Sequence, residues 1–229
     1  NRRRGGSCKR GGKCHGECLM IKNVICDMGN VLLDYNPRMV VDTFCETEEE
    51  KDVVMRELFK GPEWGMMDEG ILTKEECLKR VCSRCDSRFH EKIGICLDRW
   101  TICMKPLPGV YDFLADLRNA GYGLYVLSNA APSFHDYFPE SYPEGTFNGI
   151  VVSCDEKLVK PDLRIYELIC DRYDLTPEEC IFVDDREENV EAARKIGMHA
   201  VTFEGDYGVV WRYLIMDMNR ATGPFVKKC

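Results

Sequence analysis

The stretch from Ile181 to Met198, IFVDDREENVEAARKIGM, decides the fold. An apolar run that starts at Cys180 ends at two consecutive acids, Asp184 and Asp185, and a helical pattern follows until Gly197. Short apolar runs bounded by turn residues are typical of buried parallel strands, and a glycine after the last helical turn is typical of a helix end. The stretch therefore predicts a strand, a turn carrying two carboxylates, and a helix.

The same alternation extends over the second half of the chain and begins near its start. We expect strands at 21–26, 123–127, 149–153, 180–183 and 199–203, and helices at 110–119, 163–173 and 188–196. Strands that alternate with helices form a parallel sheet with right-handed crossovers. The predicted fold class is therefore α/β, with a Rossmann-like parallel sheet sandwiched between helices.

A helical block interrupts this sheet after its first strand. From about residue 38 to 105 apolar residues recur at spacings of three and four, and Thr73 with Glu76 has the pattern of a capping box. We predict an α/β core over 21–36 and 106–229, and an inserted all-helical domain over 37–105.

The first 20 residues, NRRRGGSCKRGGKCHGECLM, have a different character. They carry too few apolar side chains to offset the entropy of ordering them, so we expect a poorly structured basic extension over 1–20. We also expect Met20 to be the natural start, with residues 1–19 as upstream sequence. Zinc donors do occur here, although their spacing matches no zinc motif: Cys8, Cys14, His15 and Cys18.

Composition excludes several classes of protein. The 229 residues carry a net charge of -8, which argues against a nucleic-acid-binding protein. There is no run of 18 apolar residues to span a membrane and no apolar signal region, so we expect a cytoplasmic protein.

The 14 cysteines are scattered, and we expect most to be reduced thiols, with Cys82 and Cys85 as an alternative metal or redox pair. The oligomeric state, monomer or dimer, stays open.

Polar side chains follow three of the predicted strands. Because ligands bind beyond the carboxyl ends of the strands in an open parallel sheet, we expect these side chains to share one site. The set consists of Asp27, Ser128, Asn129, Asp184 and Asp185, together with Lys160 just before the helix at 163–173.

These residue types together are suited to binding a metal ion and a phosphate. Three crowded carboxylates repel one another unless a hard cation lies among them, and Mg²⁺ prefers oxygen ligands. An aspartate can attack a metal-bound phosphate to form an acyl-phosphate, which water then cleaves. A hydroxyl and a lysine would hold the phosphoryl oxygens. The set therefore indicates hydrolysis of phosphate monoesters.

Four segments together resemble the motifs of the haloacid dehalogenase-like (HAD) superfamily, over about Ile21 to Phe203. They are VICDMGNVLLDY (24–35), LYVLSNA (124–130), VKPDLRIYELI (159–169) and the stretch quoted first. The helical block lies where this family carries its C1 cap, which closes over the site and selects the substrate.

The resemblance implies a role for each residue at the predicted site. Asp27 would be the nucleophile and a metal ligand, and Lys160 would neutralise charge on the nucleophile and the phosphate. Ser128 and Asn129 would bind the phosphoryl group. The Mg²⁺ ligands would be Asp27, the carbonyl of Gly29, Asp184 and Asp185. The implied substrate is a small phosphorylated metabolite.

One position departs from the family pattern. The family's phosphatases usually carry Asp-x-Asp in the first motif, with the second Asp as general acid and base, whereas this chain has Asp27-Met28-Gly29. The Asp-x-Gly-Asn-Val form resembles a subgroup that includes bacterial α-glucose-1-phosphate phosphatase. We therefore expect a sugar phosphate with a good leaving group, or a proton donor from elsewhere: Asp34, Asp68 or Glu69.

Two alternatives remain open. A HAD fold with weak catalysis could serve as a binding or regulatory module, and a metal-free 2-haloacid dehalogenase could use the same nucleophile. Trp64, Met66 and Met67 could line the substrate side of the cap or pack it on the core, and Tyr35 could border the site. We expect the remaining histidines to be structural: His90, His135 and His199.

Overall fold

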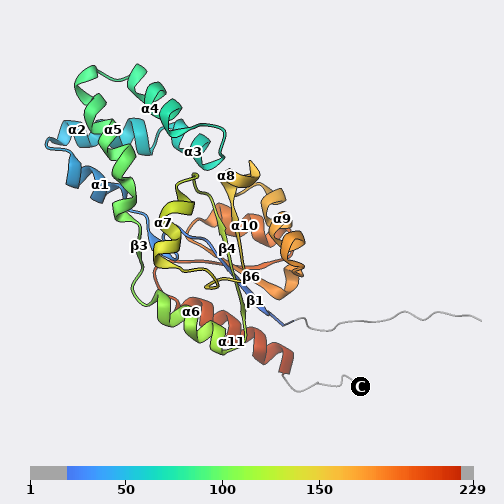
Figure 1. Ribbon diagram of the computed structural model, residues 1–229. Coiled ribbons are helices and arrows are strands. Elements are labelled where there is room, and N and C mark those ends of the chain that lie inside the picture. The colour runs from blue at the N-terminus through green and yellow to red at the C-terminus, as the bar shows by residue number, and fades with distance from the viewer. Residues whose placement is uncertain (1–19, 223–229) are drawn as a thin grey trace, which may run out of the picture.

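The computed structural model describes residues 20–222, and its centre is a five-stranded parallel sheet in the order β5-β4-β1-β6-β7 (Figure 1). The predicted zinc donors of the N-terminal extension lie outside the described residues. The strands are β1 (Asn23–Cys26), β4 (Gly123–Ser128), β5 (Gly149–Val152), β6 (Cys180–Asp184) and β7 (His199–Thr202). All five predicted strands are confirmed, and β1 lies between β4 and β6.

Helices cover both faces of the sheet. Side chains alternate along each strand, so that Ile25 and Phe182 pack on one face while Val24 and Val126 pack on the other. The first face is covered by α9 (Leu163–Tyr173) and α10 (Glu187–Lys195), and the second by α6 (Val110–Asn119), α7 (Phe134–Ser141) and α11 (Gly208–Thr222). The predicted fold class, a Rossmann-like α/β sandwich, is confirmed. Among the described residues, no helix is both long and apolar enough to cross a membrane.

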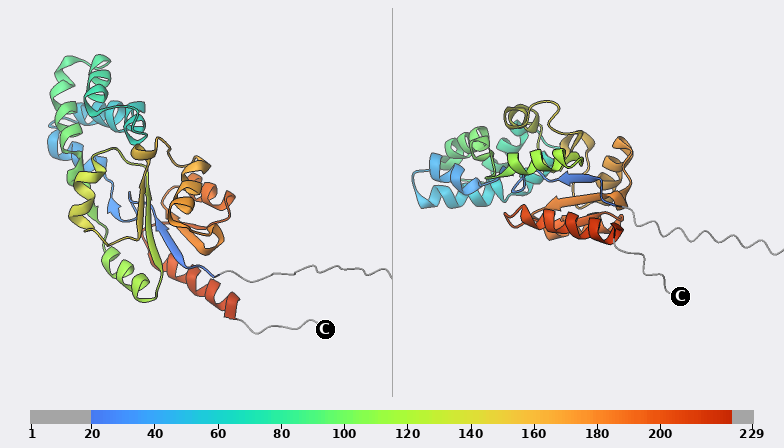
Figure 2. Two further views of the ribbon diagram at one scale, coloured as in Figure 1. Left: turned by 45° about the vertical axis from the view of Figure 1, so that its right-hand side comes forward. Right: turned by 90° about the horizontal axis from the view of Figure 1, so that it is seen from below.

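A run of helices follows β1 and lies beyond one end of the sheet (Figure 2). We call residues 37–103 the helical segment. Its elements are α1 (Pro37–Phe44), α2 (Glu48–Val54), the π-helix η1 (Met55–Phe59), α3 (Pro62–Asp68), α4 (Lys74–Ser83), the short η2 (Ser87–Phe89), α5 (His90–Arg99) and η3 (Trp100–Cys103). The capping box predicted at Thr73 and Glu76 is confirmed, and Thr47 with Glu50 forms a second one.

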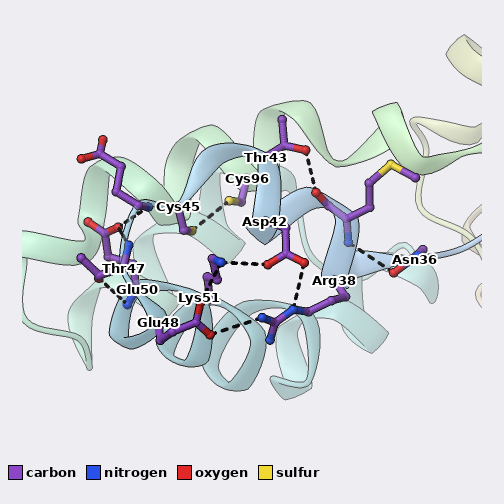
Figure 3. A network of polar contacts seen from close by, with 12 residues as sticks. Asn36, Arg38, Asp42, Thr43, Cys45, Thr47, Glu48, Glu50, Lys51 and Cys96 are labelled. Carbon is purple, nitrogen blue, oxygen red and sulfur yellow. Dashed lines mark hydrogen bonds and ion pairs between the residues drawn. The ribbon is translucent and has the colours of Figure 1, made fainter.

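A polar network joins the first helices of the helical segment (Figure 3). Lys51 Nζ lies 3.0 Å from Asp42 Oδ1, and Arg38 contacts both Asp42 and Glu48. Such exposed ion pairs contribute little stability, so most of the stability of these helices comes from the buried apolar side chains beneath them.

The Sγ atoms of Cys45 and Cys96 approach within 4.0 Å without a disulfide, and all ten described cysteines are free thiols, Cys82 and Cys85 included.

A short ribbon joins the helical segment to the sheet, and the sequence did not predict it. In this ribbon β2 (Leu33–Asp34) pairs antiparallel with β3 (Lys105–Pro106). Two-residue strands are too short to show any periodicity. Three helices were also not predicted from the sequence: α7, which contains Pro139, the one-turn α8 (Ser153–Glu156) and α11.

The end of α3 contacts the core closely at α8. Ser153 Oγ donates a hydrogen bond to the carbonyl of Asp68, and Lys157 Nζ donates to the carbonyls of Gly70 and Cys154. Gly70 has φ +68°, and a Cβ added there would lie 2.3 Å from the carbonyl oxygen of Cys154. Glycine is therefore needed both for the turn after α3 and for the close approach of the helical segment to the core.

We predict that Gly70→Ala destabilises this contact, because alanine at positive φ is strained by about 1–3 kcal/mol and its methyl group would collide with α8. Urea unfolding should report a lower free energy of unfolding, and limited proteolysis should cut faster between α3 and α4. The matched control is Gly94→Ala in the interior of α5, where the nearest atom, Leu78 Cδ1, lies 3.9 Å away. That control should stabilise by about 0.5–1 kcal/mol. Equal effects of the two variants would contradict the inference that glycine is required at position 70.

Candidate active site

The candidate site lies where β1, β4 and β6 end. Asp27 follows β1, and its backbone N–H donates to the carbonyl of Val183, 2.8 Å away. Ser128 and Asp184 are the last residues of β4 and β6. Because β1 lies between the other two strands, the parallel register brings these three side chains to one edge of the sheet.

Lys160 joins two of the carboxylates. Its Nζ lies 2.7 Å from Asp27 Oδ1 and 2.7 Å from Asp184 Oδ2, and its side chain is 1% exposed. Asn129 holds the loop that carries this lysine, because its Oδ1 accepts from Lys160 N and its Nδ2 donates to the Lys160 carbonyl. Asn129 therefore positions Lys160. This role was not predicted from the sequence, where Asn129 was expected to bind the phosphoryl group.

Two further asparagines hold the acid pair, and the sequence analysis missed both. Asn189 Nδ2 lies 3.0 Å from each carboxylate oxygen of Asp184, whose Oδ1 also accepts from the backbone N–H of Arg186. Asn30 Nδ2 donates to Asp185 Oδ2 at 2.9 Å. The available signal was weak: Asn189 lies five residues after Asp184 in the first turns of α10, and Asn30 follows the Asp-x-Gly turn.

One carboxylate oxygen from each of Asp27, Asp184 and Asp185 lies within 4.8 Å of the other two. All are hard oxygen donors, and Gly29 lines the cavity into which Asp27 and Asp185 face. This donor set fits Mg²⁺, which takes carboxylate and carbonyl oxygens and keeps part of its water shell for a substrate phosphate.

Electrostatics at this edge are set by burial and by Lys160. Burial raises the pKa of Asp27 to about 7, although the Lys160 ammonium opposes this and the carboxylate of Asp184 adds to it. Burial alone would lower the pKa of Lys160, but the two carboxylates that it contacts outweigh burial and raise it. A bound divalent cation would favour the ionised form of Asp27.

Ser128 carries an unusual hydroxyl. Its Oγ is the one buried side-chain polar atom that lacks a hydrogen-bond partner within residues 20–222. An unpaired buried hydroxyl is costly, so this oxygen fits a group that arrives with the ligand, such as a phosphoryl oxygen. Ser128 itself does not line the cavity described next, whereas Asn129 and Ala130 do.

A cavity of about 560 Å³, which we call the catalytic cavity, is lined by Asp27 and Lys160. The sheet edge forms one wall of this cavity, and the opposite wall consists of side chains in or near the helical segment: Tyr35, Phe59, Trp64, Asp68 and Trp100. Tyr35 and Trp64 thus border the site, as the sequence analysis considered. Met66 does not line it, and the three histidines lie outside it with partners of their own.

Asp68 is the candidate proton donor that faces the catalytic cavity, whereas Asp34 and Glu69 do not line it. It ends α3, and its carboxylate accepts from the backbone N–H of Ala131. Desolvation raises the pKa of Asp68 to about 8, and the charge of Asp27 adds to the rise. The raised pKa favours the protonated form of Asp68, which is the form that can donate a proton.

A sequence model of the family described as haloacid dehalogenase-like hydrolase matches residues 21–197. Among curated proteins, the chain is 32% identical over 182 residues to the sesquiterpene phosphatase astK of Aspergillus oryzae, covering 79% of this chain and 89% of that protein. It is 24% identical over 204 residues to a D-ribitol-5-phosphate phosphatase of Bacteroides thetaiotaomicron, covering 84% of this chain and 96% of the relative.

Among solved structures, the fold is similar to that of a HAD family enzyme of Bacteroides thetaiotaomicron, BT-2542. The TM-score is 0.66 at 22% identity, covering 84% of this chain and 99% of that chain. The wild-type form of the same enzyme was also solved as a complex with magnesium and inorganic phosphate, and its TM-score to this chain is 0.60.

We predict that Asn189→Leu weakens Mg²⁺ binding by about 10–100-fold, because the residues that orient metal-binding carboxylates have effects of that size. Isothermal titration calorimetry with Mg²⁺ alone measures this without any turnover. Asn119→Leu at the exposed end of α6 is the matched control and should bind Mg²⁺ like the unaltered protein. Unchanged Mg²⁺ affinity in Asn189→Leu would refute its role in holding Asp184.

Proposed function

The chain belongs to the haloacid dehalogenase-like hydrolase family, and from that premise we propose that it is a Mg²⁺-dependent phosphatase that forms an aspartyl-phosphate at Asp27. One observation carries the proposal: a buried lysine bridges Asp27 and Asp184 at 2.7 Å from each, with Asp185 close by. Such a cluster of acids around one cation and one nucleophile is suited to binding and attacking a phosphate.

The residues that would hold the ion are Asp27, the Gly29 carbonyl, Asp184 and Asp185. Bound there, Mg²⁺ would supply charge to neutralise the phosphoryl oxygens and to orient the phosphorus toward Asp27. Asn30 and Asn189 fix two of these carboxylates, so little reorganisation would accompany ion binding.

The reaction then has two displacements at phosphorus. A carboxylate oxygen of Asp27 forms a bond to phosphorus while the bond from phosphorus to the alcohol oxygen breaks. Water next attacks the phosphorus of the acyl-phosphate, which releases inorganic phosphate and restores Asp27. Lys160 compensates the negative charge of nucleophile and phosphate, and the Ser128 hydroxyl donates to a phosphoryl oxygen.

Asp68 supplies the proton that Gly29 cannot. In the first step its carboxylic acid donates a proton to the departing alcohol oxygen, and in the second its carboxylate accepts a proton from the attacking water. Its place on α3 puts the proton donor on the helical segment, which we propose acts as the cap. Closure of that segment excludes bulk water and completes the site in one movement.

The rival activities fit this geometry less well. A dehalogenase that works without metal gains nothing from the extra carboxylates of Asp184 and Asp185, which oppose the charge of its nucleophile. A purely regulatory module has no need of the proton donor at Asp68. The two phosphatases reported above are named for substrates of opposite polarity, a sesquiterpene and ribitol 5-phosphate, so family membership leaves the alcohol open.

The first test measures phosphate release from p-nitrophenyl phosphate and from a panel of monoesters, with Mg²⁺ and with EDTA. We expect turnover that requires Mg²⁺ and that falls to the buffer rate in Asp27→Asn, because an amide cannot act as the nucleophile. The matched control, Asp34→Asn on β2, lies outside the catalytic cavity and should keep its activity. No release from any monoester, despite Mg²⁺ binding, would favour the regulatory module.

A second test concerns the proton. With an alkyl phosphate, kcat/KM should fall above a pH of about 8, where Asp68 loses its proton. Asp68→Asn should lower kcat by about 10²–10⁴-fold and remove that alkaline fall. With p-nitrophenyl phosphate, whose leaving group needs no proton, the first turnover should keep its rate. An unchanged pH profile in Asp68→Asn would show that another group donates the proton.

A third test restores the family's usual proton donor. Gly29 does not have a positive φ, and a Cβ added there would meet only Tyr35 Cβ, at an ordinary 3.7 Å. Adding Gly29→Asp to Asp68→Asn should therefore recover kcat on alkyl phosphates by at least about tenfold. Gly29→Asn in the same background has the same shape without an acidic proton and should recover nothing. Recovery by both would mean that the substitution acts through structure alone.

A further inference from the structure

A second cavity lies between the helical segment and α7, next to the catalytic one. Building on the proposed function, we propose that this cavity binds an apolar alcohol moiety, so that the substrate is the monophosphate of a hydrophobic alcohol. The phosphate would lie at Asp27 and the hydrocarbon would extend into the second cavity.

The second cavity has a volume of about 700 Å³. This is within the range of about 300–1,000 Å³ that small-molecule sites occupy. Its walls come from the end of α3 and the turn into α4, the end of α5, η3, and α7 with the residues just before it. It is therefore large enough for a substrate side chain and is built from both parts of the molecule.

Three aromatic side chains line both cavities: Trp64, Trp100 and Tyr137. The rings of Trp64 and Trp100 lie 5.2 Å apart, and those of Trp100 and Tyr137 lie 5.5 Å apart, each pair edge to face. The two cavities are thus neighbours that share these three rings as a common wall. A chain attached to a phosphate at Asp27 would pass along these rings, which offer it apolar contact.

The inner wall of the second cavity is apolar. Besides the shared aromatic rings, it consists of four buried side chains, Met67, Leu72, Leu97 and Met104. A sugar or polyol bound against such side chains would leave hydroxyl groups without hydrogen-bond partners, which is costly. The cavity therefore favours hydrocarbon over the sugar expected from the sequence.

The charged groups that line the second cavity are mainly acidic. Asp98, Asp136 and Glu140 lie here, and Lys74, the one cation among the described lining residues, is paired with Asp98. These acidic groups disfavour a second phosphate at the far end of the substrate. The geometry thus fits a neutral hydrocarbon with a single phosphate at one end.

The test compares ethyl, butyl, hexyl and octyl phosphate below their micelle-forming concentrations, with ribitol 5-phosphate and glucose 1-phosphate alongside. We expect kcat/KM to rise with chain length by up to about fourfold for each buried methylene. Octyl phosphate should also exceed both polyol phosphates. A flat profile, with ethyl phosphate still hydrolysed, would overturn the apolar cavity and leave the phosphatase proposal standing.

Two variants fill the cavity from opposite walls. Ser133, whose side chain makes no capping hydrogen bond at the start of α7, and Thr101 on η3 both line the second cavity and not the catalytic one. Ser133→Phe and Thr101→Phe should each lower the ratio of kcat/KM for octyl over ethyl phosphate by at least about tenfold. Glu144→Phe, exposed and outside both cavities, should leave that ratio unchanged. An unchanged ratio in both filled variants would refute the assignment.

A binding measurement separates this inference from turnover. Non-hydrolysable ethyl- and octylphosphonate can be titrated against the Mg²⁺-loaded protein while following tryptophan fluorescence, to which Trp64 and Trp100 contribute. We expect the octyl compound to bind tighter, by the same factor per methylene, and to lose that advantage in Ser133→Phe. Equal dissociation constants for the two phosphonates would overturn the apolar cavity, even if no phosphate monoester is hydrolysed.

Discussion

The crowding of three carboxylates at the ends of parallel strands is the constraint on which the rest of the structure depends. Asp27 directly follows β1 and Asp184 ends the neighbouring strand β6, and the buried Nζ of Lys160 compensates their mutual repulsion. Asn129 then fixes the loop that carries this lysine. The α/β fold is what brings these groups together, because β1 lies between β4 and β6 and all three run the same way.

The helical segment contributes an acid and aromatic side chains that the strands of the sheet do not carry. It contacts the core through the turn at Gly70, which only glycine allows, and this contact brings Asp68 into the catalytic cavity. The same helices supply Trp64 and Trp100, which line the catalytic cavity and the apolar one alike. Proton donation and substrate selection would thus depend on a single closed position of the segment, so a loosened contact should affect both.

Most of the fold could be predicted from the sequence because parallel strands and their helices carry strong local patterns. The helix at 110–119 and the turn at Asp184 and Asp185 are examples. The ribbon of β2 and β3 and the helix α7, with its internal proline, could not be predicted, since their pairing and packing are tertiary. At the site, the residue types alone indicated phosphate monoester hydrolysis. Which acid faces Asp27, and which asparagines hold the acid pair, depends on contacts between distant segments.

The measurement that tests the central claim most directly is to trap phosphate on Asp27. p-Nitrophenyl phosphate should phosphorylate Asp68→Asn at a normal rate, because its leaving group needs no proton, while hydrolysis of the acyl-phosphate slows without the carboxylate that accepts a proton from water. Acid-quenched mass spectrometry should then find one added phosphoryl group, on the peptide that contains Asp27. Turnover with no covalent phosphate, or phosphate on another residue, would contradict the account.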